Sequence, residues 1–280
     1  MSDKINLGVE NVFSKDVLLP FSKRRRTGTG GRSGVEHTDL AILVSDALKS
    51  QGERNLRIKN NASSQYTKID VDADFLVVQN YGLYDVNLTI DSAVNGINGL
   101  DTGSLAMIWY SIWVIYSPRN GLIAGLFSAS ADDPVLPENY TEARRVGWVL
   151  NIASPTNLLS FQQKGHKVWW RDYIGFDENP ISSTTWTTVN NAPDVNYIPP
   201  GIELVECFFN TVNDDVAVQS AWVREDAATG GSKVVGSTKN ATRTNVVMEI
   251  PVTSARKFQA RVSDVDVGLE ILLFGWTDPF

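Results

Sequence analysis

Short apolar runs with a period of two recur along most of the chain, and this pattern limits the fold more than any other feature. The clearest run is MIWYSIWVIY at 107–116, in which both alternating sets of residues are apolar. Successive side chains of a strand point to opposite faces, so two apolar faces indicate a strand that is covered on both sides. The following residues, Pro118–Gly121, are turn formers. We therefore predict a central strand that continues through a hairpin into the run at 121–128.

Similar runs, rich in Val, Ile, Tyr, Phe and Trp, are separated by Gly, Pro, Asn and Asp. Residues of the first group favour strands and those of the second favour turns. The pattern predicts about ten strands, the clearest at 68–78, 83–90, 107–117, 121–128, 146–152, 158–170, 201–212, 216–224, 244–252, 257–262 and 268–276. Short strands at this spacing are typical of sandwiches and barrels. We predict an all-β fold, β-sandwich or jelly-roll-like, with an extended N-terminal arm and one short helix.

Charge divides the chain into an arm and a body. Residues 1–34 hold seven Lys/Arg and three Asp/Glu, net +4, whereas residues 35–280 hold 18 Lys/Arg and 29 Asp/Glu, net −11. Within the arm, residues 22–34 join a basic run to a stretch of Gly, Ser and Thr, which neither nucleates a helix nor buries apolar area. The segment TDLAILVSDALKSQ at 38–51 has apolar residues at helical spacing and predicts the one short helix.

These patterns predict two parts of the chain. Residues 1–60 form a basic arm with a short helix that anchors the protein, and residues 61–280 form a β-rich body. The stretch 171–200 is rich in Asn, Asp and Pro, which is typical of a long surface excursion. The body would divide near this stretch if it holds two domains.

Five cations of the arm are candidate assembly residues: Lys23, Arg24, Arg25, Arg26 and Arg32. The four consecutive cations give only a salt-dependent contact with nucleic acid, and the acidic body would repel that ligand. Carboxylates and backbone carbonyls of adjacent subunits are simpler partners. The arm's glycines match neither a dinucleotide-binding loop nor a P-loop. We therefore expect the arm to hold copies of this chain and other subunits of an assembly.

Reactive side chains are few. One cysteine and two histidines exclude an internal disulfide framework and leave little for a transition-metal site. Cys207 lies in the apolar run VECFF, where a thiol is usually an inert core residue. Asp70, Asp72 and Asp74 share a strand face but do not fit the calcium-loop pattern, so we favour a solvated face over a surface Ca²⁺ site. We expect no metal and no cofactor.

Neighbouring aspartates at 132–133, 214–215 and 264–266 are candidates for glycan hydrolysis. Adjacent carboxylates lack the separation of about 5–10 Å that acid and base roles require, so we expect the chain not to be an enzyme. The longest apolar stretch without charge, 105–118, is too short to span a bilayer, and the first residues lack an apolar signal core. We therefore expect neither a membrane span nor Sec-dependent secretion.

Aromatic side chains in the 169–200 region form a candidate recognition surface. Most tryptophans and tyrosines lie in strand runs, where core packing is the default. The exceptions are Trp169, Trp170, Tyr173, Trp186 and Tyr197. Aromatic faces stack on sugar rings, so this group is a candidate site for a host surface glycan.

Three phrases between residues 67 and 170 form a distinctive succession. They are GLDTGS at 99–104, an aromatic strand ending in WVIY at 113–116, and PENY at 137–140 followed by arginines and VG. In this succession the segment resembles one found in tail and virion structural proteins of tailed bacteriophages. The resemblance covers somewhat over a third of the chain. It implies a place in a virion, assembled in the bacterial cytoplasm, and it brings no catalytic residues.

Resemblance and residue patterns together predict a phage virion structural protein of the tail or tail fibres. It would assemble as a homo-oligomer through its N-terminal arm, with host attachment as a further role. Two alternatives stay open. One is a capsid decoration or cement protein whose arm runs over the shell, and the other is a glycan-binding receptor-recognition module. A glycan depolymerase is the weakest alternative, because no carboxylate stands out.

Overall fold

The computed structural model describes residues 52–153, 157–175, 180–189, 196–213, 218–225, 232–238 and 243–279. These residues belong to one compact unit that begins at Gly52, and we call this unit the body. Within the described ranges the body consists of strands and loops without a helix, which confirms the predicted all-β class. The arm and the predicted helix at 38–51 lie outside the described residues.

The largest sheet runs through the whole body. In this sheet β4 pairs with one edge of β3, and β1 and β2 both pair with the other edge. From β2 the order continues through β9, β10, β17, β12 and β15. Their bounds are β1 Glu53–Arg54, β2 Arg57–Asn60, β3 Lys68–Val78, β4 Tyr81–Asp91, β9 Phe161–Lys164, β10 Lys167–Gly175, β12 Leu204–Asn213, β15 Arg243–Pro251 and β17 Val267–Thr277.

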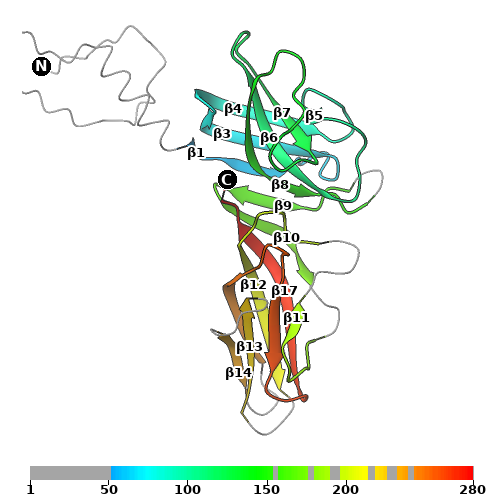
Figure 1. Cartoon of the computed structure of the whole chain (residues 1–280), viewed down its shortest axis with the longest axis vertical. Helices are drawn as coiled ribbons and strands as arrows, with labels where there is room; N and C mark the ends of the chain where they lie inside the picture. The colour runs from blue at the N-terminus through cyan, green and yellow to red at the C-terminus, as the bar shows by residue number, and fades with distance from the viewer. Residues whose placement is uncertain are drawn as a thin grey trace, which may run out of the picture. The chain divides into compact units, whose positions relative to one another are not determined.

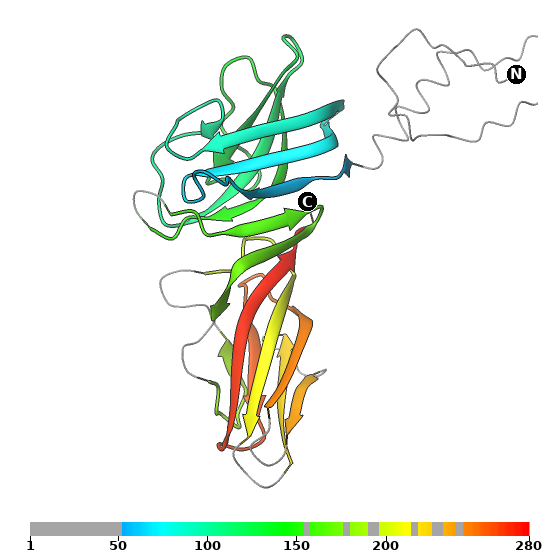
Figure 2. The ribbon, with the colours of Figure 1, turned by 180° about the vertical axis from the view of Figure 1, so that it is seen from behind.

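Two four-stranded sheets cover different parts of this large sheet (Figures 1 and 2). The first has the order β5 (Gly99–Leu100), β7 (Leu122–Ser128), β6 (Trp109–Ser117), β8 (Glu142–Leu150) and packs on β3 and β4. The second has the order β11 (Thr187–Val189), β16 (Phe258–Val262), β13 (Gln219–Glu225), β14 (Lys233–Thr238) and packs on β12, β15 and β17. The body is therefore two sandwich-like halves, the first and the second sandwich, that share one sheet.

The predicted central strand is confirmed as β6. It lies between β7 and β8, and every residue of it except Tyr116 is buried. One set of its side chains, including Ile112 and Val114, faces the large sheet, while Trp113 and Ile115 pack in an outer cluster with Tyr140. The predicted hairpin is confirmed as well, because β6 and β7 pair antiparallel around the turn at 118–121.

The described residues hold seventeen strands rather than about ten. The patterns missed β1 and β2, which are polar, β5 and β11, which have two and three residues, and β14, which contains Gly236. The run at 158–170 is two strands, β9 and β10, because Gly165 and His166 form a turn. Since β1 and β2 both pair with β3, the body begins at Gly52 rather than at residue 61.

A cluster of four tryptophans fills the core where the two sandwiches meet. Trp109 and Trp148 come from the first sandwich, Trp170 lies in β10, and Trp276 lies in β17; none is more than 7% exposed. The ring centroid of Trp109 lies 5.6 Å from that of Trp276 and 5.8 Å from that of Trp170. Aromatic rings at these separations add to the energy of area burial. The two sandwiches therefore share a core as well as a sheet.

Gly275 in β17 allows the close approach of β10. A Cβ added at this position would overlap the carbonyl oxygen of Val168 and lie 3.2 Å from the Cα of Trp169. Both are backbone atoms, so they cannot rotate away. We expect Gly275→Ala to lower the free energy of unfolding by about 2–3 kcal/mol, because overpacking forces the backbone apart. Urea titration of the purified protein measures the change.

Gly103→Ala is the control for this variant. A Cβ there would have no atom within 4 Å, and only its positive φ of 77° opposes a side chain. We expect a loss of about 1 kcal/mol. Equal losses in the two variants would contradict the close approach of β10 and β17.

Candidate recognition surface and assembly segment

The five predicted assembly residues of the arm, Lys23 to Arg26 and Arg32, lie outside the described residues. The structure does describe the point at which the body begins. Arg144 of β8 donates from Nη1 to the carbonyls of Gly52 and Val77, and its Nη2 lies 3.1 Å from Glu53 Oε2. Burial raises the pKa of Glu53 and lowers that of Arg144. One arginine thus fastens the start of the body to β3 and β8.

A second ion pair joins the two sandwiches. Asp278 follows β17 and is fully buried, and its Oδ1 lies 3.4 Å from Nη2 of Arg145 in β8. The backbone N–H of Asp278 donates to the carbonyl of His166 at 2.8 Å, and His166 Nδ1 donates to the carbonyl of Asp278 at 2.8 Å. The residue after β17 is therefore held by both the first sandwich and the β9–β10 turn.

Trp170 does not belong to an exposed recognition surface, contrary to the sequence-based prediction. It is 5% exposed and packs between Trp109 and Trp276 in the junction core. Composition placed it in the excursion, but it lies inside β10 on the same face as the buried Val168. Alternation along a strand turns both side chains toward the core.

Of the other four predicted aromatic residues, the three with described side chains lie on different elements. Trp169 is half-buried on the opposite face of β10, in the large sheet. Tyr197 is half-buried against the core, next to Asn196, whose carbonyl accepts a hydrogen bond from Trp109. Tyr173 lies in β10, and the position of its side chain is outside the described part. Trp186 precedes β11 in the second four-stranded sheet.

Trp186 contacts charged side chains. The guanidinium carbon of Arg224 lies 4.1 Å from the centroid of its ring, and that of Arg261 lies 4.8 Å away. Arg261 also lies 4.9 Å from the ring of Trp222. Cations over indole faces are attracted by the quadrupole of the ring. Two tryptophans and two arginines thus form one stack, which with Gln259 we call the arginine–tryptophan face.

Strand alternation places this face on the outside of the second sandwich. Ala221 and Val223 of β13 are buried, so Trp222 and Arg224 point the other way. β16 pairs with β13 and sets Arg261 opposite Trp222, and β11 pairs with the other edge of β16. The inner residues fill the core, and the outer residues of β13 and β16 meet Trp186, just before β11, in the stack.

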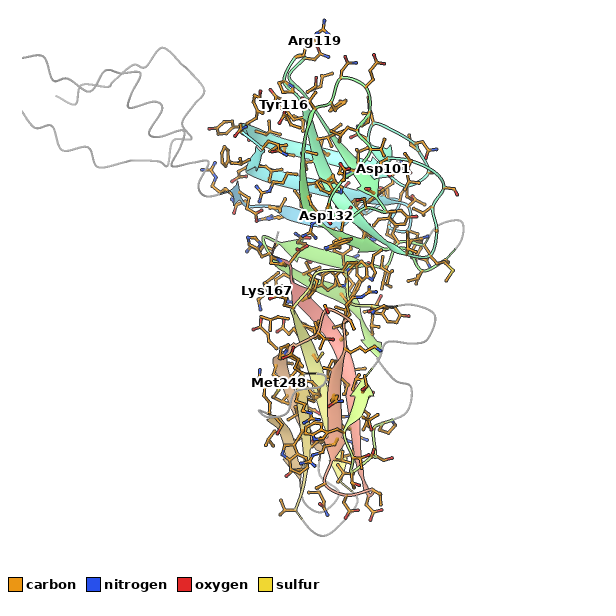
Figure 3. The ribbon with its side chains drawn as sticks, viewed as in Figure 1. Asp101, Tyr116, Arg119, Asp132, Lys167 and Met248 are labelled. Atoms are coloured by element: carbon orange, nitrogen blue, oxygen red, sulfur yellow. The ribbon has the colours of Figure 1, made fainter. Side chains whose placement is uncertain are left out.

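The two arginines of this face have no carboxylate partner among the described residues. Arg224 donates from Nε to Gln259 Oε1 at 2.8 Å, and the buried Nε of Arg261 has no hydrogen-bond partner within the described ranges. Lys167, labelled in Figure 3, shows the contrast, because its Nζ lies 3.1 Å from a carboxylate oxygen of Glu249. The arginine–tryptophan face is therefore a positive site on an acidic body.

Sequence reasoning identified Trp186 but missed Arg224, Arg261 and Trp222. The available signal was local: W-V-R in β13 and Q-A-R in β16 place their polar and aromatic residues on one face of each strand. The stack depends on the pairing of β13 with β16, which joins residues about forty positions apart. No pattern within a single strand reports that pairing.

The described residues that the sequence analysis considered for metal binding or catalysis lie on strands and loops outside the arginine–tryptophan face. Asp70 Oδ1 accepts hydrogen bonds from Asn61 and Thr89, at 2.9 and 2.8 Å, on the outer face of β3. Cys207 is fully buried, which raises the pKa of its thiol and confirms its expected place in the core. Asp132 and Asp133 are exposed in a loop, and the pair at 214–215 lies outside the described residues.

Among the described residues, no group of three His, Cys, Asp or Glu side chains is arranged to hold a metal ion. In the same residues, no helix has the length and apolar character that a bilayer crossing requires. No protein-family model matches the chain, and no curated protein matches its sequence.

Proposed function

We propose that this chain is a structural protein of the tail or tail fibres of a tailed bacteriophage. It assembles as a homo-oligomer through an extended, basic N-terminal arm, and its place is the virion. The body carries no reaction in this proposal. Its task is to present a stiff surface at a fixed position on the particle.

The observation that supports the proposal most is where the three phage-like phrases lie in the fold. GLDTGS starts with the two residues of β5, WVIY lies in the second half of β6, and PENY comes just before β8. All three strands belong to the same four-stranded sheet. Tyr140 of the third phrase packs with Trp113 of the second, and the backbone N–H of Val135 donates to Asp101 of the first at 3.1 Å. The resemblance therefore follows one folded unit.

The two sandwiches of the body are joined in a way that suits a rigid structural subunit. The two sandwiches share a sheet, the tryptophan cluster and the ion pair between Arg145 and Asp278. Repeated copies raise the effective concentration of each contact, so single contacts of the arm can be weak. The arm's cations would pair with carboxylates or backbone carbonyls of neighbouring subunits.

Replacement of Lys23, Arg24, Arg25 and Arg26 by alanine tests this role. We expect the variant to fold and to be absent from purified particles, because the four replacements remove the cations that hold it there. Quantitative mass spectrometry of particles from a complemented deletion measures incorporation, and thermal unfolding of the purified variant measures the body.

The matched control replaces four exposed cations of the body, Arg57, Lys59, Lys164 and Arg243, by alanine. It removes the same charge and is expected to leave incorporation unchanged. Normal incorporation of the arm variant would overturn anchoring by the arm. Absence of the unaltered protein from particles would overturn the structural role itself.

A further inference from the structure

We propose that the arginine–tryptophan face binds an acidic polysaccharide through its carboxylates. This inference goes beyond the proposed place in the virion and depends on that proposal only for where binding would act. It rests on Trp186, Trp222, Arg224 and Arg261, with Gln259 beside them.

The face carries two positive charges. Arg224 and Arg261 lie on the same indole ring, so their positive charges are close and repel each other. No carboxylate within the described ranges forms an ion pair with either of them, although residues 35–280 carry a net charge of −11. A bound anion would relieve the repulsion, and the rest of the body does not supply one within the described residues.

The geometry of the hydrogen-bond donors on this face suits a carboxylate. A guanidinium that stacks on an aromatic face keeps its N–H groups in its own plane, where they remain available to an anion. Gln259 accepts the Nε–H of Arg224, and the Nε of Arg261 is buried and has no hydrogen-bond partner in the described part, so an anion would bind the terminal Nη groups of both arginines. Planar guanidinium groups bind carboxylates through two parallel hydrogen bonds. The stack therefore fixes two guanidinium groups before an anion binds, so binding loses less side-chain conformational entropy.

The surroundings of the two arginines favour a polysaccharide over other anions. Around the arginines, the outer face of the sheet carries indole rings together with the half-buried or exposed Gln259, Thr188 and Ser220. Aromatic rings stack on sugar rings, and amides and hydroxyls bind sugar hydroxyls. Duplex DNA carries one charge per about 1.7 Å of its axis and would meet strong repulsion from the acidic body. A polymer that carries one carboxylate on each sugar, separated by neutral hydroxyls, has a lower charge density and fits this surface better.

The test measures binding of the full-length protein to polygalacturonate at low salt, with dextran, poly-L-glutamate and duplex DNA as comparison ligands. We expect polygalacturonate to bind, and the three others to bind at least about tenfold more weakly. Arg224→Gln combined with Arg261→Gln should weaken polygalacturonate binding by at least about tenfold, because it removes both charge-assisted pairs. Replacement of both by lysine should give an intermediate loss, because the charge stays and the paired donors go.

Arg243→Gln is the matched control, since Arg243 is exposed in β15 of the same sandwich and is absent from the stack. It should change polygalacturonate binding less than about twofold. Thermal unfolding of every variant shows whether the stack is purely structural. In that case the arginine replacements would lower the unfolding midpoint without changing polygalacturonate binding. The inference is overturned if unaltered protein does not bind polygalacturonate, if poly-L-glutamate or DNA binds as tightly, or if the control loses as much as the double variant. None of these results bears on incorporation into particles, so the two proposals fail separately.

Discussion

Trp276→Ala is expected to lower the free energy of unfolding of the body by about 4 kcal/mol, the range for a buried tryptophan. The ring of Trp276 is 2% exposed and lies 5.0 Å from that of Trp170 and 5.6 Å from that of Trp109, centroid to centroid. Its removal leaves a cavity between two sandwiches rather than within one. For a body of this size the midpoint of thermal unfolding should fall by about 10 °C.

Trp276→Phe is the control, because it keeps an aromatic ring in the cluster. The indole nitrogen of Trp276 has no hydrogen-bond partner among the described residues. Replacement by phenylalanine therefore removes buried volume but no hydrogen bond. We expect a loss of about 1–2 kcal/mol, at most about half of that for alanine. Calorimetry and near-ultraviolet circular dichroism measure the two variants. Equal, small losses in both would contradict a shared core.

Asp278→Asn is expected to lower the free energy of unfolding by about 3 kcal/mol, because it leaves the guanidinium of Arg145 partly buried without its counter-ion. Asp278 is fully buried, Arg145 is 20% exposed, and their closest charged atoms lie 3.4 Å apart. The amide keeps the shape of the carboxylate, so the variant tests charge rather than packing. Urea unfolding at neutral pH measures the loss.

The matching double variant, Asp278→Asn with Arg145→Met, should recover much of that loss, because it removes the unpaired charge. A double-mutant cycle gives the coupling energy between the two positions. If Asp278→Asn has no effect, or if the losses simply add, then the pair does not hold the sandwiches together. Asp278 would then be held mainly by its hydrogen bonds with His166 in the β9–β10 turn.

Sequence patterns were most informative where the structure is local. Alternation at 107–116 and the turn at 118–121 predicted β6 and its hairpin, because strand, turn and next strand are contiguous. The same reasoning misplaced Trp170, since the Asn- and Pro-rich residues that follow it were given more weight than its position beside the buried Val168.

What the sequence did not reveal depends on pairing between distant segments. The large sheet joins β2 to β9 and β10 to β17, strands about one hundred residues apart, and this brings four tryptophans together. Arg224 and Arg261 share one ring for the same reason, through the pairing of β13 with β16. The strand register that determines these contacts is fixed by how whole faces pack, which no single segment shows.

The most direct test of the account is to image whole particles at a resolution that traces residues 1–60 and shows what they contact. We predict that the arm lies on tail or neck subunits, that the copies are related by symmetry, and that the body projects outward. An arm on the capsid lattice would contradict the tail position and identify a cement protein. Particles without the chain would contradict the proposed structural role altogether.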